Sequence, residues 1–381
     1  MGATVVAFWV AVATVVYVYA GYPCLILALG RLRRWPVRKR SHLPHVSFII
    51  SAYNEEAAIG AKLENTLALD YPADRLEVIV VSDGSTDRTE EIVRSFGKRV
   101  KLLSLTGRNG KTMAQNRAVE QATGEVLVFS DATTVYQPAA VRVLMENYAD
   151  PKVGAVGARA FMGTERQASI VKGRSIYVDY EHFLRRYESM FHSTLGLGGC
   201  AYSLRRSLYT PLPADVISDF VEAVKVLEKG YRVVLEEEAI VYEPSESYSI
   251  AEELQRRTRI IVRGLRGWYY MREFFHPLRH PWFCFQMLSH RLLRWAAPLF
   301  LIAAFAINAA LLAHPVFRLL FVAQAALYLL AALAYLLEKR NVRLPGLFIP
   351  LYFFVVNLAP LLAVRALLQG EKKVTWETGR T

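Results

Sequence analysis

Long apolar segments lie near both ends of the chain, and a stretch of mixed character separates them. The first runs from Ala3 to Leu29 almost without interruption. Three more follow towards the C-terminus, at about Trp295–Ala313, Val316–Leu337 and Leu347–Leu368. A helix rises about 1.5 Å per residue and the hydrocarbon core of a bilayer is about 30 Å thick, so each segment is long enough to cross a membrane. The pattern therefore predicts about four transmembrane helices.

In the middle of the chain, short apolar runs alternate with segments of helical character. The short runs are rich in β-branched residues and end in polar clusters; they are His45–Ser51, Leu76–Val81, Val100–Leu105 and Glu125–Phe129. The helical segments between them are Ala57–Leu69, Thr86–Phe96 and Lys111–Ala122. Strands that alternate with helices predict an α/β domain with a mostly parallel, mixed sheet. The polar clusters fall just after the strands, where open α/β sheets bind ligands.

The remaining segment, residues 266–293, mixes aromatic side chains with Arg and His. That composition is typical of amphipathic helices in the membrane interface. The predicted order is an N-terminal transmembrane helix in 1–30, the α/β domain in 43–265, interfacial helices in 266–293 and about three transmembrane helices in 294–370.

The charge distribution indicates an orientation in the membrane. The net charge is +12, and a basic run from Arg31 to Arg40 directly follows the first apolar segment. Positive residues favour the cytoplasmic side, which predicts an integral protein of the inner or plasma membrane with a cytoplasmic α/β domain. The same run suits contact with anionic membrane lipids. No nucleic-acid-binding module accompanies the charge, so nucleic acid is not an expected partner.

Two aspartates follow predicted strands. Asp83 comes after Leu76–Val81, and Asp131 comes after Glu125–Phe129. A carboxylate at such a position can accept hydrogen bonds from a base or ribose, or can bind Mg²⁺ or Mn²⁺ together with substrate phosphates. Taken singly, either residue is equally well explained as an ordinary turn aspartate.

Other charged residues near predicted helices admit two interpretations each. Lys111 could reach a diphosphate from the start of a helix, or could be a solvated lysine. Asp219 could be a general base or a helix cap. Arg256, Arg259 and Arg263 fall on one helical face, which suits either a diphosphate leaving group or anionic lipid.

Taken in order, the motifs are AYNEE, SDGSTD, NGK, SDA and SDF-x₉-GYRV, followed by an Arg-rich helix and apolar segments. In that order the sequence resembles the membrane-bound family 2 glycosyltransferases, which include cellulose, chitin and hyaluronan synthases. The resemblance runs from Ser47 to the last apolar segment. It implies a GT-A fold, inverting transfer from a nucleotide-sugar, usually a UDP-sugar, and a Mg²⁺ or Mn²⁺ cofactor.

The resemblance also implies roles for single residues. Those expected to hold the nucleoside are Tyr53, Glu55 and Asp83. Lys111 would lie near the uridine or the diphosphate, and Asp131 would bind the metal and the donor. Asp219 would be the general base, and the residues expected at the diphosphate as it leaves are Arg256 and Arg259.

Three positions depart from the pattern of that family. Thr133 stands where a second metal-binding acid is usual, which predicts weaker metal affinity. Ser218 replaces the acid that usually precedes the base. In the register that keeps Arg259, Ile260 occupies the Trp position of the Gln-x-x-Arg-Trp motif. That Trp stacks on the acceptor sugar, so its loss argues against long-chain processive synthesis.

Three functions remain open at this point. The first is transfer to a glycan or lipid-linked acceptor in exopolysaccharide or cell-envelope synthesis. The second is non-processive transfer to polyprenyl phosphate or another membrane lipid. The third is a non-catalytic membrane protein that binds a nucleotide-sugar, which the retention of Asp83, Asp131, Asp219 and Arg259 disfavours.

Overall fold

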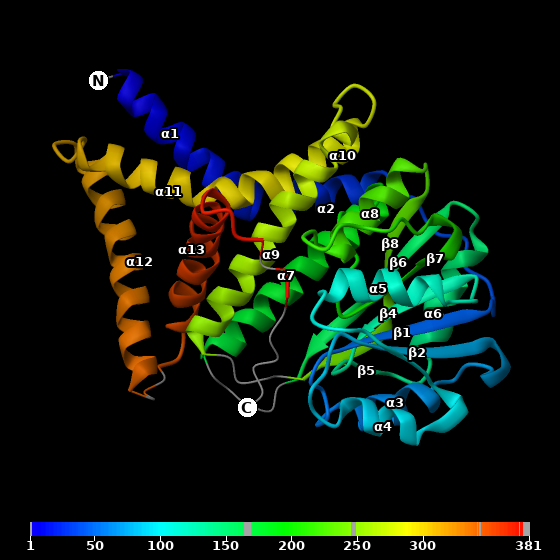
Figure 1. The fold of residues 1–381 in the computed structure, drawn as a ribbon. Helices are drawn as coiled ribbons and strands as arrows, with labels where there is room; N and C mark the ends of the chain where they lie inside the picture. Colours follow the sequence, from blue (N-terminus) through cyan, green and yellow to red (C-terminus); the bar gives the residue numbers. More distant parts are fainter. Residues whose placement is uncertain are drawn as a thin grey trace.

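The chain forms an α/β domain that is joined to a group of long helices (Figure 1). The computed structural model describes residues 2–163, 169–244, 249–340, 342, 344–372 and 374–375. The α/β domain lies on one side of the molecule, and the apolar helices of both chain ends lie together on the other.

Eight strands of the described residues form one mixed sheet, in the order β3-β2-β1-β4-β7-β6-β8-β5. The first four in this order are parallel, β7 is antiparallel to both neighbours, β6 and β8 are parallel, and β5 is antiparallel to β8. The strands are β1 (Val46–Ala52), β2 (Leu76–Ser82), β3 (Lys101–Ser104), β4 (Val126–Asp131), β5 (Val135–Tyr136), β6 (Val153–Met162), β7 (Ala201–Arg205) and β8 (Arg232–Glu243). The predicted mostly parallel, mixed sheet is confirmed.

Helices cover both faces of this sheet, which explains why its central strands read as continuous apolar runs. Side chains of β1 alternate between two cores: Phe48 packs with helices on one face, and Ile49 packs with helices on the other. The helices on the Phe48 face are α3 (Ile59–Leu67), α4 (Thr89–Ser95) and α6 (Ala140–Glu146). The helices on the Ile49 face are α5 (Lys111–Glu120) and α8 (Ser218–Glu228).

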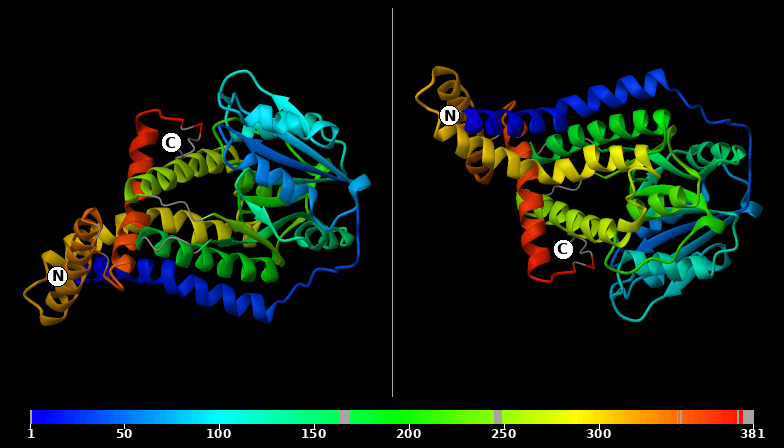
Figure 2. Two further views of the ribbon diagram at one scale, coloured as in Figure 1. Left: turned by 90° about the horizontal axis from the view of Figure 1, so that it is seen from below. Right: turned by 90° about the horizontal axis from the view of Figure 1, so that it is seen from above.

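Two long helices extend from the α/β domain into the apolar part of the molecule (Figure 2). These are α7 (Ser169–Phe191) and α9 (Ile250–Tyr270). Leu184 and Phe191 of α7 pack against Tyr22, and Val262 of α9 packs against Ala359. The predicted boundary near residue 265 is therefore not a separation in space, because both helices bury an apolar face against the terminal helices.

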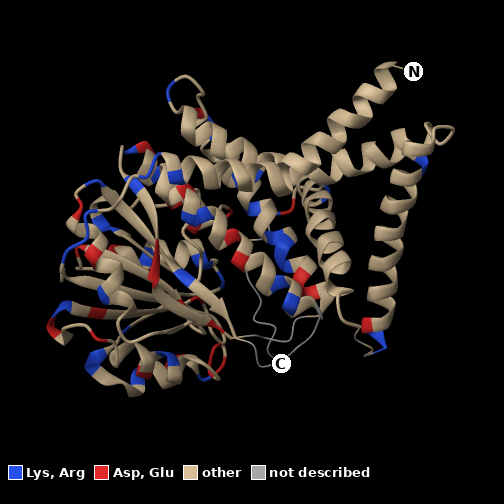
Figure 3. Ribbon diagram, turned by 180° about the vertical axis from the view of Figure 1, so that it is seen from behind, with Lys and Arg blue, Asp and Glu red and all other residues tan. Residues whose placement is uncertain are grey.

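Four helices of the described residues are long and apolar enough to cross a membrane. They are Gly2–Leu32, Pro281–Ala309, Pro315–Lys339 and Phe348–Leu368. They include α1 (Gly2–Val16), α2 (Tyr22–Leu32), α10 (Pro281–Gln286), α11 (Leu293–Ala309), α12 (Pro315–Lys339) and α13 (Phe348–Leu368). Charged residues are sparse on α1, α11 and α12 (Figure 3).

The second of these four helices begins earlier than the sequence pattern predicts. It starts at Pro281 rather than near Trp295, and a π-helical stretch, Met287–Leu292, connects α10 to α11. The segment 266–293, expected as interfacial helices, is thus divided between the end of α9, a turn region and the start of this long helix. The helix is continuous from Pro281, but His290, Arg291 and Arg294 interrupt the apolar sequence, so the apolar run becomes recognisable only near Trp295.

Candidate active site

The polar clusters predicted at strand ends come together at one edge of the sheet. In the register of the parallel strands, Ser51 pairs with Asp131, and Ala52 pairs with Ser82. The carboxyl ends of β1, β2 and β4 therefore lie side by side. Asp83 directly follows β2, while Asp131 is the last residue of β4.

Asp83 holds the loop that leads into α5. Its carboxylate is buried and accepts hydrogen bonds from the backbone N–H groups of Asn109 (2.7 Å) and Gly110 (2.9 Å). Gly84 has φ +74°, and an added β-carbon would lie 2.6 Å from the carbonyl oxygen of Gly107. The close approach of these two turns requires glycine at position 84. Asp83 thereby sets the position of Lys111, the first residue of α5.

Tyr53 and Arg108 form a stacked pair above this edge. The guanidinium carbon of Arg108 lies 3.9 Å from the centre of the Tyr53 ring. Glu55 is buried, and its backbone N–H donates to Thr89 Oγ1 at 2.8 Å. A stacked aromatic ring and guanidinium plane offer a surface on which a nucleobase could pack.

Lys111, Asp131, Gly199 and Asp219 form a compact group that we call the reaction cluster. Lys111 Nζ donates to the Asp131 carboxylate and, at 2.7 Å, to the carbonyl oxygen of Gly199. A β-carbon on Gly199 would lie 3.5 Å from Asp219 Oδ2 and 3.8 Å from Lys111 Nζ. Three of the predicted site residues therefore meet around one glycine.

The antiparallel pairing of β7 with β4 explains this convergence. Ser130 pairs with Ala201, so the residues before β7 lie beside the end of β4. The backbone N–H of Asp131 donates to the carbonyl oxygen of Cys200 at 3.2 Å. The backbone N–H of Leu197 donates to the carbonyl oxygen of Asp219 at 3.3 Å, which fixes the start of α8 against the same loop.

The donor set around Asp131 fits a divalent cation that is held partly by its substrate. The described residues contain no group of three or more His, Cys, Asp or Glu side chains that could hold a metal ion alone. The Asp131 side chain is 41% exposed and can present a carboxylate oxygen outward. Mg²⁺ is commonly bound by one or two carboxylates together with substrate phosphates, so one carboxylate is compatible with a metal–diphosphate complex.

The arginines of α9 do not share one environment. Arg256 pairs with the buried Glu253 at 2.9 Å and lines a cavity that also contains Asp219. Arg263, which the sequence placed on the same face, is buried and donates to Thr112 Oγ1 at 2.7 Å. Burial lowers the pKa of Arg263 to about 10, and the charge of Arg259 acts in the same direction. Arg259 is half-buried and is not among the described residues that line the cavity.

We call this space the interhelical cavity; its volume is about 250 Å³. It begins at Gly198, Gly199 and Asp219 and extends between α7, α9, α11 and α13. It therefore connects the reaction cluster with helices that can cross a membrane.

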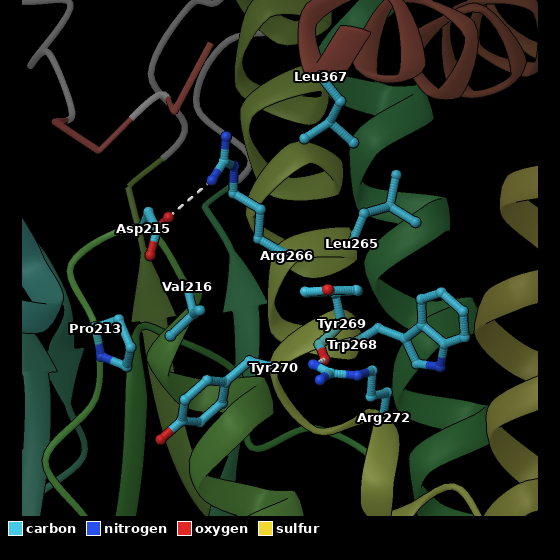
Figure 4. Close-up of a pocket in the computed structure, with 10 residues that line it drawn as sticks. All are labelled: Pro213, Asp215, Val216, Leu265, Arg266, Trp268, Tyr269, Tyr270, Arg272 and Leu367. Atoms are coloured by element: carbon cyan, nitrogen blue, oxygen red, sulfur yellow. Dashed lines mark hydrogen bonds and ion pairs between the residues drawn. The ribbon is translucent and has the colours of Figure 1, made fainter. Parts of the chain in front are cut away.

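A larger hollow of about 610 Å³ lies at the C-terminal end of α9 (Figure 4). Trp268, Tyr269 and Tyr270 contribute most of its aromatic surface. Its one acidic side chain among the described lining residues, Asp215, pairs with Arg266 at 2.8 Å. This hollow is suited to an apolar or amphipathic group, and the described residues that line it offer no carboxylate other than the paired Asp215.

Lys62 contacts the turn that follows Asp131. Its ammonium group donates to the carbonyl oxygen of Thr134 at 2.6 Å and lies 4.3 Å from the centre of the Tyr136 ring. The side chain is buried, and this burial lowers the pKa of Lys62 from 10.5 to about 7, against the opposing attraction of Asp131. A cation is thus held where the fold disfavours its charge.

Replacing Lys62 with methionine is expected to change how stability depends on pH. The unfolded chain keeps a lysine pKa near 10.5, whereas the folded chain has one of about 7, so between these values the unfolded state binds more protons. This makes the wild-type protein more stable as pH rises, and Lys62→Met removes that contribution. As the pH is raised from about 6 to about 10, the melting temperature of the wild type should therefore rise relative to that of Lys62→Met. Parallel curves for the two proteins would contradict the assignment.

Sequence reasoning did not assign three arginines that the structure places near these groups. Arg108 stacks on Tyr53, while Arg185 and Arg291 line the interhelical cavity. Arg108 stands beside the Asn-Gly-Lys motif, so its position was a usable signal. Arg185 and Arg291 lie in α7 and in the π-helical stretch before α11, far in sequence from any strand end.

Comparisons with known proteins agree with this architecture. The family model described as Glycosyl transferase family 2 matches residues 47–210. Poly-beta-1,6-N-acetyl-D-glucosamine synthase from Staphylococcus epidermidis is 36% identical over 114 residues, which cover 29% of this chain and 27% of that protein. The synthase of the same name from Staphylococcus aureus is 26% identical over 215 residues, 54% of this chain and 51% of that protein. The matches thus span about half or less of these relatives.

A solved structure matches over a larger share of the chain. The mannosyltransferase PcManGT from Pyrobaculum calidifontis, in complex with GDP-Man and Mn²⁺, superimposes with a TM-score of 0.68 and 26% identity. The match covers 93% of this chain and 99% of that one. It includes the α/β domain and the long helices around it. The domain that contains residues 47–210 therefore belongs to glycosyltransferase family 2 and has a GT-A fold, and four described helices of the chain are long and apolar enough to cross a membrane.

Proposed function

We propose that this enzyme transfers a sugar, with inversion, from a nucleotide-sugar to a glycan or lipid-linked acceptor at the cytoplasmic face of the inner or plasma membrane. The relatives named as poly-N-acetylglucosamine synthases support a role in exopolysaccharide or cell-envelope synthesis. The family resemblance makes a UDP-sugar the first choice of donor. A GDP-sugar is the second candidate donor, because the mannosyltransferase structure contains GDP-Man.

The observation that carries this proposal is the reaction cluster. It combines a lysine, a half-exposed carboxylate and a second carboxylate around Gly199. A transfer that displaces a diphosphate requires groups that stabilise the charge of the leaving group and a base that faces the acceptor. Lys111, together with a cation held by Asp131, would supply the first requirement at the sheet edge, and Asp219 would supply the second from α8.

The acceptor step follows from the position of Asp219. Its carboxylate would take the proton from an acceptor hydroxyl as the oxygen attacks the anomeric carbon of the donor. The backbone bond from Leu197 to Asp219 keeps this carboxylate beside Gly199, so the acceptor would be oriented before reaction. Positioning a nucleophile in this way lowers the barrier by removing translational and rotational freedom in advance.

Asp131 would hold Mg²⁺ or Mn²⁺ together with oxygens of the donor diphosphate. When bound, that cation would neutralise the negative charge that grows on the diphosphate. Lys111, whose ammonium group contacts Asp131 and the carbonyl oxygen of Gly199, would also pair with the diphosphate. Tyr53, Glu55 and Arg108 would line the nucleoside end of the site, and Asp83 would shape it through the loop that its carboxylate holds.

The absence of an acceptor-stacking Trp at Ile260 favours addition of one sugar, or a few, over long-chain synthesis. The interhelical cavity also favours a membrane-borne acceptor, since it joins Asp219 to the apolar helices. Non-processive transfer to a membrane lipid is therefore the second candidate function.

A donor panel tests the proposal directly. The full-length protein is reconstituted in lipid nanodiscs, and nucleoside diphosphate release is measured for UDP-, GDP- and dTDP-sugars with Mg²⁺, Mn²⁺ or a chelator. We expect metal-dependent release with one donor, and stimulation of that release by a lipid extract if the acceptor is lipid-linked. If the chelator does not reduce release, the proposed metal role is contradicted. If no donor gives release, the transfer reaction is contradicted.

A further inference from the structure

The interhelical cavity holds an excess of arginine side chains. Six arginines line it, namely Arg174, Arg185, Arg256, Arg257, Arg291 and Arg294. Four of them form ion pairs, with Glu243, Glu253 or Glu181. Nε of Arg185 and Nε of Arg291 are buried, and neither has a hydrogen-bond partner among the residues that the structure describes. Neither Arg185 nor Arg291 forms an ion pair with a described residue, although the charge of Arg291 helps to lower the pKa of nearby Glu181 and Glu188.

Both groups face the loop that carries the reaction cluster. A β-carbon on Gly198 would lie 2.9 Å from Nη1 of Arg185, and one on Gly196 would lie 3.1 Å from Nη2 of Arg291. The neighbouring Gly199 likewise lies close to a charged group, because a β-carbon on it would lie 3.5 Å from Oδ2 of Asp219. Two arginines and the proposed base thus surround one short glycine-rich loop and approach it closely, because Gly196, Gly198 and Gly199 have no side chains.

Beyond the ion-paired arginines, part of the cavity lining is apolar and lies between the apolar helices. Its lining there includes Ile260 and Ile261 of α9, Trp295 of α11, and Val356 and Pro360 of α13. A molecule that fits both parts needs an anionic group near Asp219 and an apolar portion that continues towards the bilayer. This combination describes a phosphate-bearing lipid better than a free glycan.

The whole cavity has a volume of about 250 Å³, slightly below the usual range for small-molecule sites. A site of this size suits a compact headgroup, such as one sugar with its phosphate, better than an extended chain of sugars.

We propose that the acceptor is a membrane lipid that carries a sugar on a phosphate or diphosphate, and that Arg185 and Arg291 bind this phosphate. The inference rests on the proposed transfer reaction and specifies its acceptor. Arginine binds phosphate through two parallel hydrogen bonds, and the buried Nε atoms of Arg185 and Arg291 have no hydrogen-bond partner among the described residues. Both observations favour a phosphate between the two side chains.

The reaction on this acceptor is balanced. A hydroxyl of the acceptor sugar gives its proton to Asp219 while its oxygen forms a bond to the anomeric carbon of the donor. The bond between that carbon and the diphosphate oxygen breaks, and its electron pair leaves with the nucleoside diphosphate. The lipid phosphate takes no part in bond making; its contacts with Arg185 and Arg291 position the sugar.

Two matched probes test the site with the full-length protein in nanodiscs. One is farnesyl diphosphate linked to N-acetylglucosamine, and the other is the farnesyl glycoside of the same sugar without phosphate. Binding of each is measured, with empty nanodiscs as background. We expect the wild-type protein to bind the diphosphate probe at least about 10-fold more tightly, in line with charge-assisted hydrogen bonds to phosphate.

Arg185→Gln and Arg291→Gln should each remove most of this preference and leave binding of the phosphate-free probe unchanged, which also shows that the variants are folded. Arg185→Lys should retain part of it. Arg186→Gln is the matched control, because Arg186 is 48% exposed and pairs with Glu237 at 3.1 Å. The Arg186→Gln variant should prefer the diphosphate probe over the phosphate-free probe to the same extent as the wild type.

Equal binding of the two probes by the wild-type protein, or a preference that survives in the Arg185→Gln, Arg291→Gln double variant, would overturn the inference. Donor turnover is followed in the same samples. Turnover without a phosphate preference would remove only this acceptor assignment. Loss of all donor turnover would count against the transfer reaction, while phosphate-dependent binding would still identify the site.

Discussion

Replacing Asp219 with asparagine is expected to lower turnover by about 10²–10⁴-fold while donor binding persists, because general-base assistance contributes about that much. Asparagine keeps the shape of the side chain and its place beside Gly199, but it cannot accept the acceptor proton. Turnover is measured as nucleoside diphosphate release in nanodiscs, and donor binding is measured separately by titration. The two readouts should therefore separate clearly in this variant.

Glu228→Gln is the matched control for that experiment. Glu228 lies at the other end of α8, is 44% exposed and pairs with Lys225 at 2.7 Å. Its loss should change neither readout, since surface ion pairs contribute little to stability. Retention of turnover within a few-fold of the wild type in Asp219→Asn would assign the base to another residue.

Replacing Asp131 with asparagine is expected to lower kcat/KM by about 10²-fold or more, the usual scale for losing one group that stabilises transition-state charge. In contrast to Asp219→Asn, this change should also weaken donor binding and raise the metal concentration needed for half-maximal activity. The variant also loses the ion pair with Lys111, so titration of Mg²⁺ and Mn²⁺ is the decisive measurement. An unchanged metal requirement would exclude Asp131 as the metal ligand.

Thr133→Asp provides the opposite test of the same site. Thr133 is half-buried two residues after Asp131, at the position where a second acid is usual. A second carboxylate should lower the metal concentration needed for half-maximal activity, because hard cations gain affinity with each anionic oxygen. If the metal titration of Thr133→Asp overlaps that of the wild type, residue 133 does not face the cation.

The strands that sequence alone could predict are those with a simple signal. β1, β2 and β4 are buried on both faces and consist almost entirely of apolar residues. The strands β6, β7 and β8 were not assigned, for identifiable reasons. β6 contains Gly154 and Gly157, β7 has only five residues, and β8 carries Glu236, Glu237 and Glu238 in its middle. Their pairing partners, rather than local propensity, make them strands.

The candidate site likewise has a part that the sequence predicts and a part that it does not. Positions after strands, together with the order of motifs, were enough to select Lys111, Asp131 and Asp219. Their contact around Gly199 depends on the antiparallel strand β7, which sequence reasoning did not find. The orientation of Arg256 and Arg263 depends on which neighbours cover each side of α9, and helical periodicity alone does not provide that information.

The packing of α7 and α9 against the terminal helices has a consequence for how this enzyme unfolds and loses activity. Apolar residues of both helices complete cores whose other half comes from α2 and α13. Catalytic and membrane parts should consequently melt in a single cooperative transition. Detergents that loosen the terminal helices should abolish activity even where every residue of the reaction cluster is intact, so the surrounding lipid acts as a structural component of the catalyst.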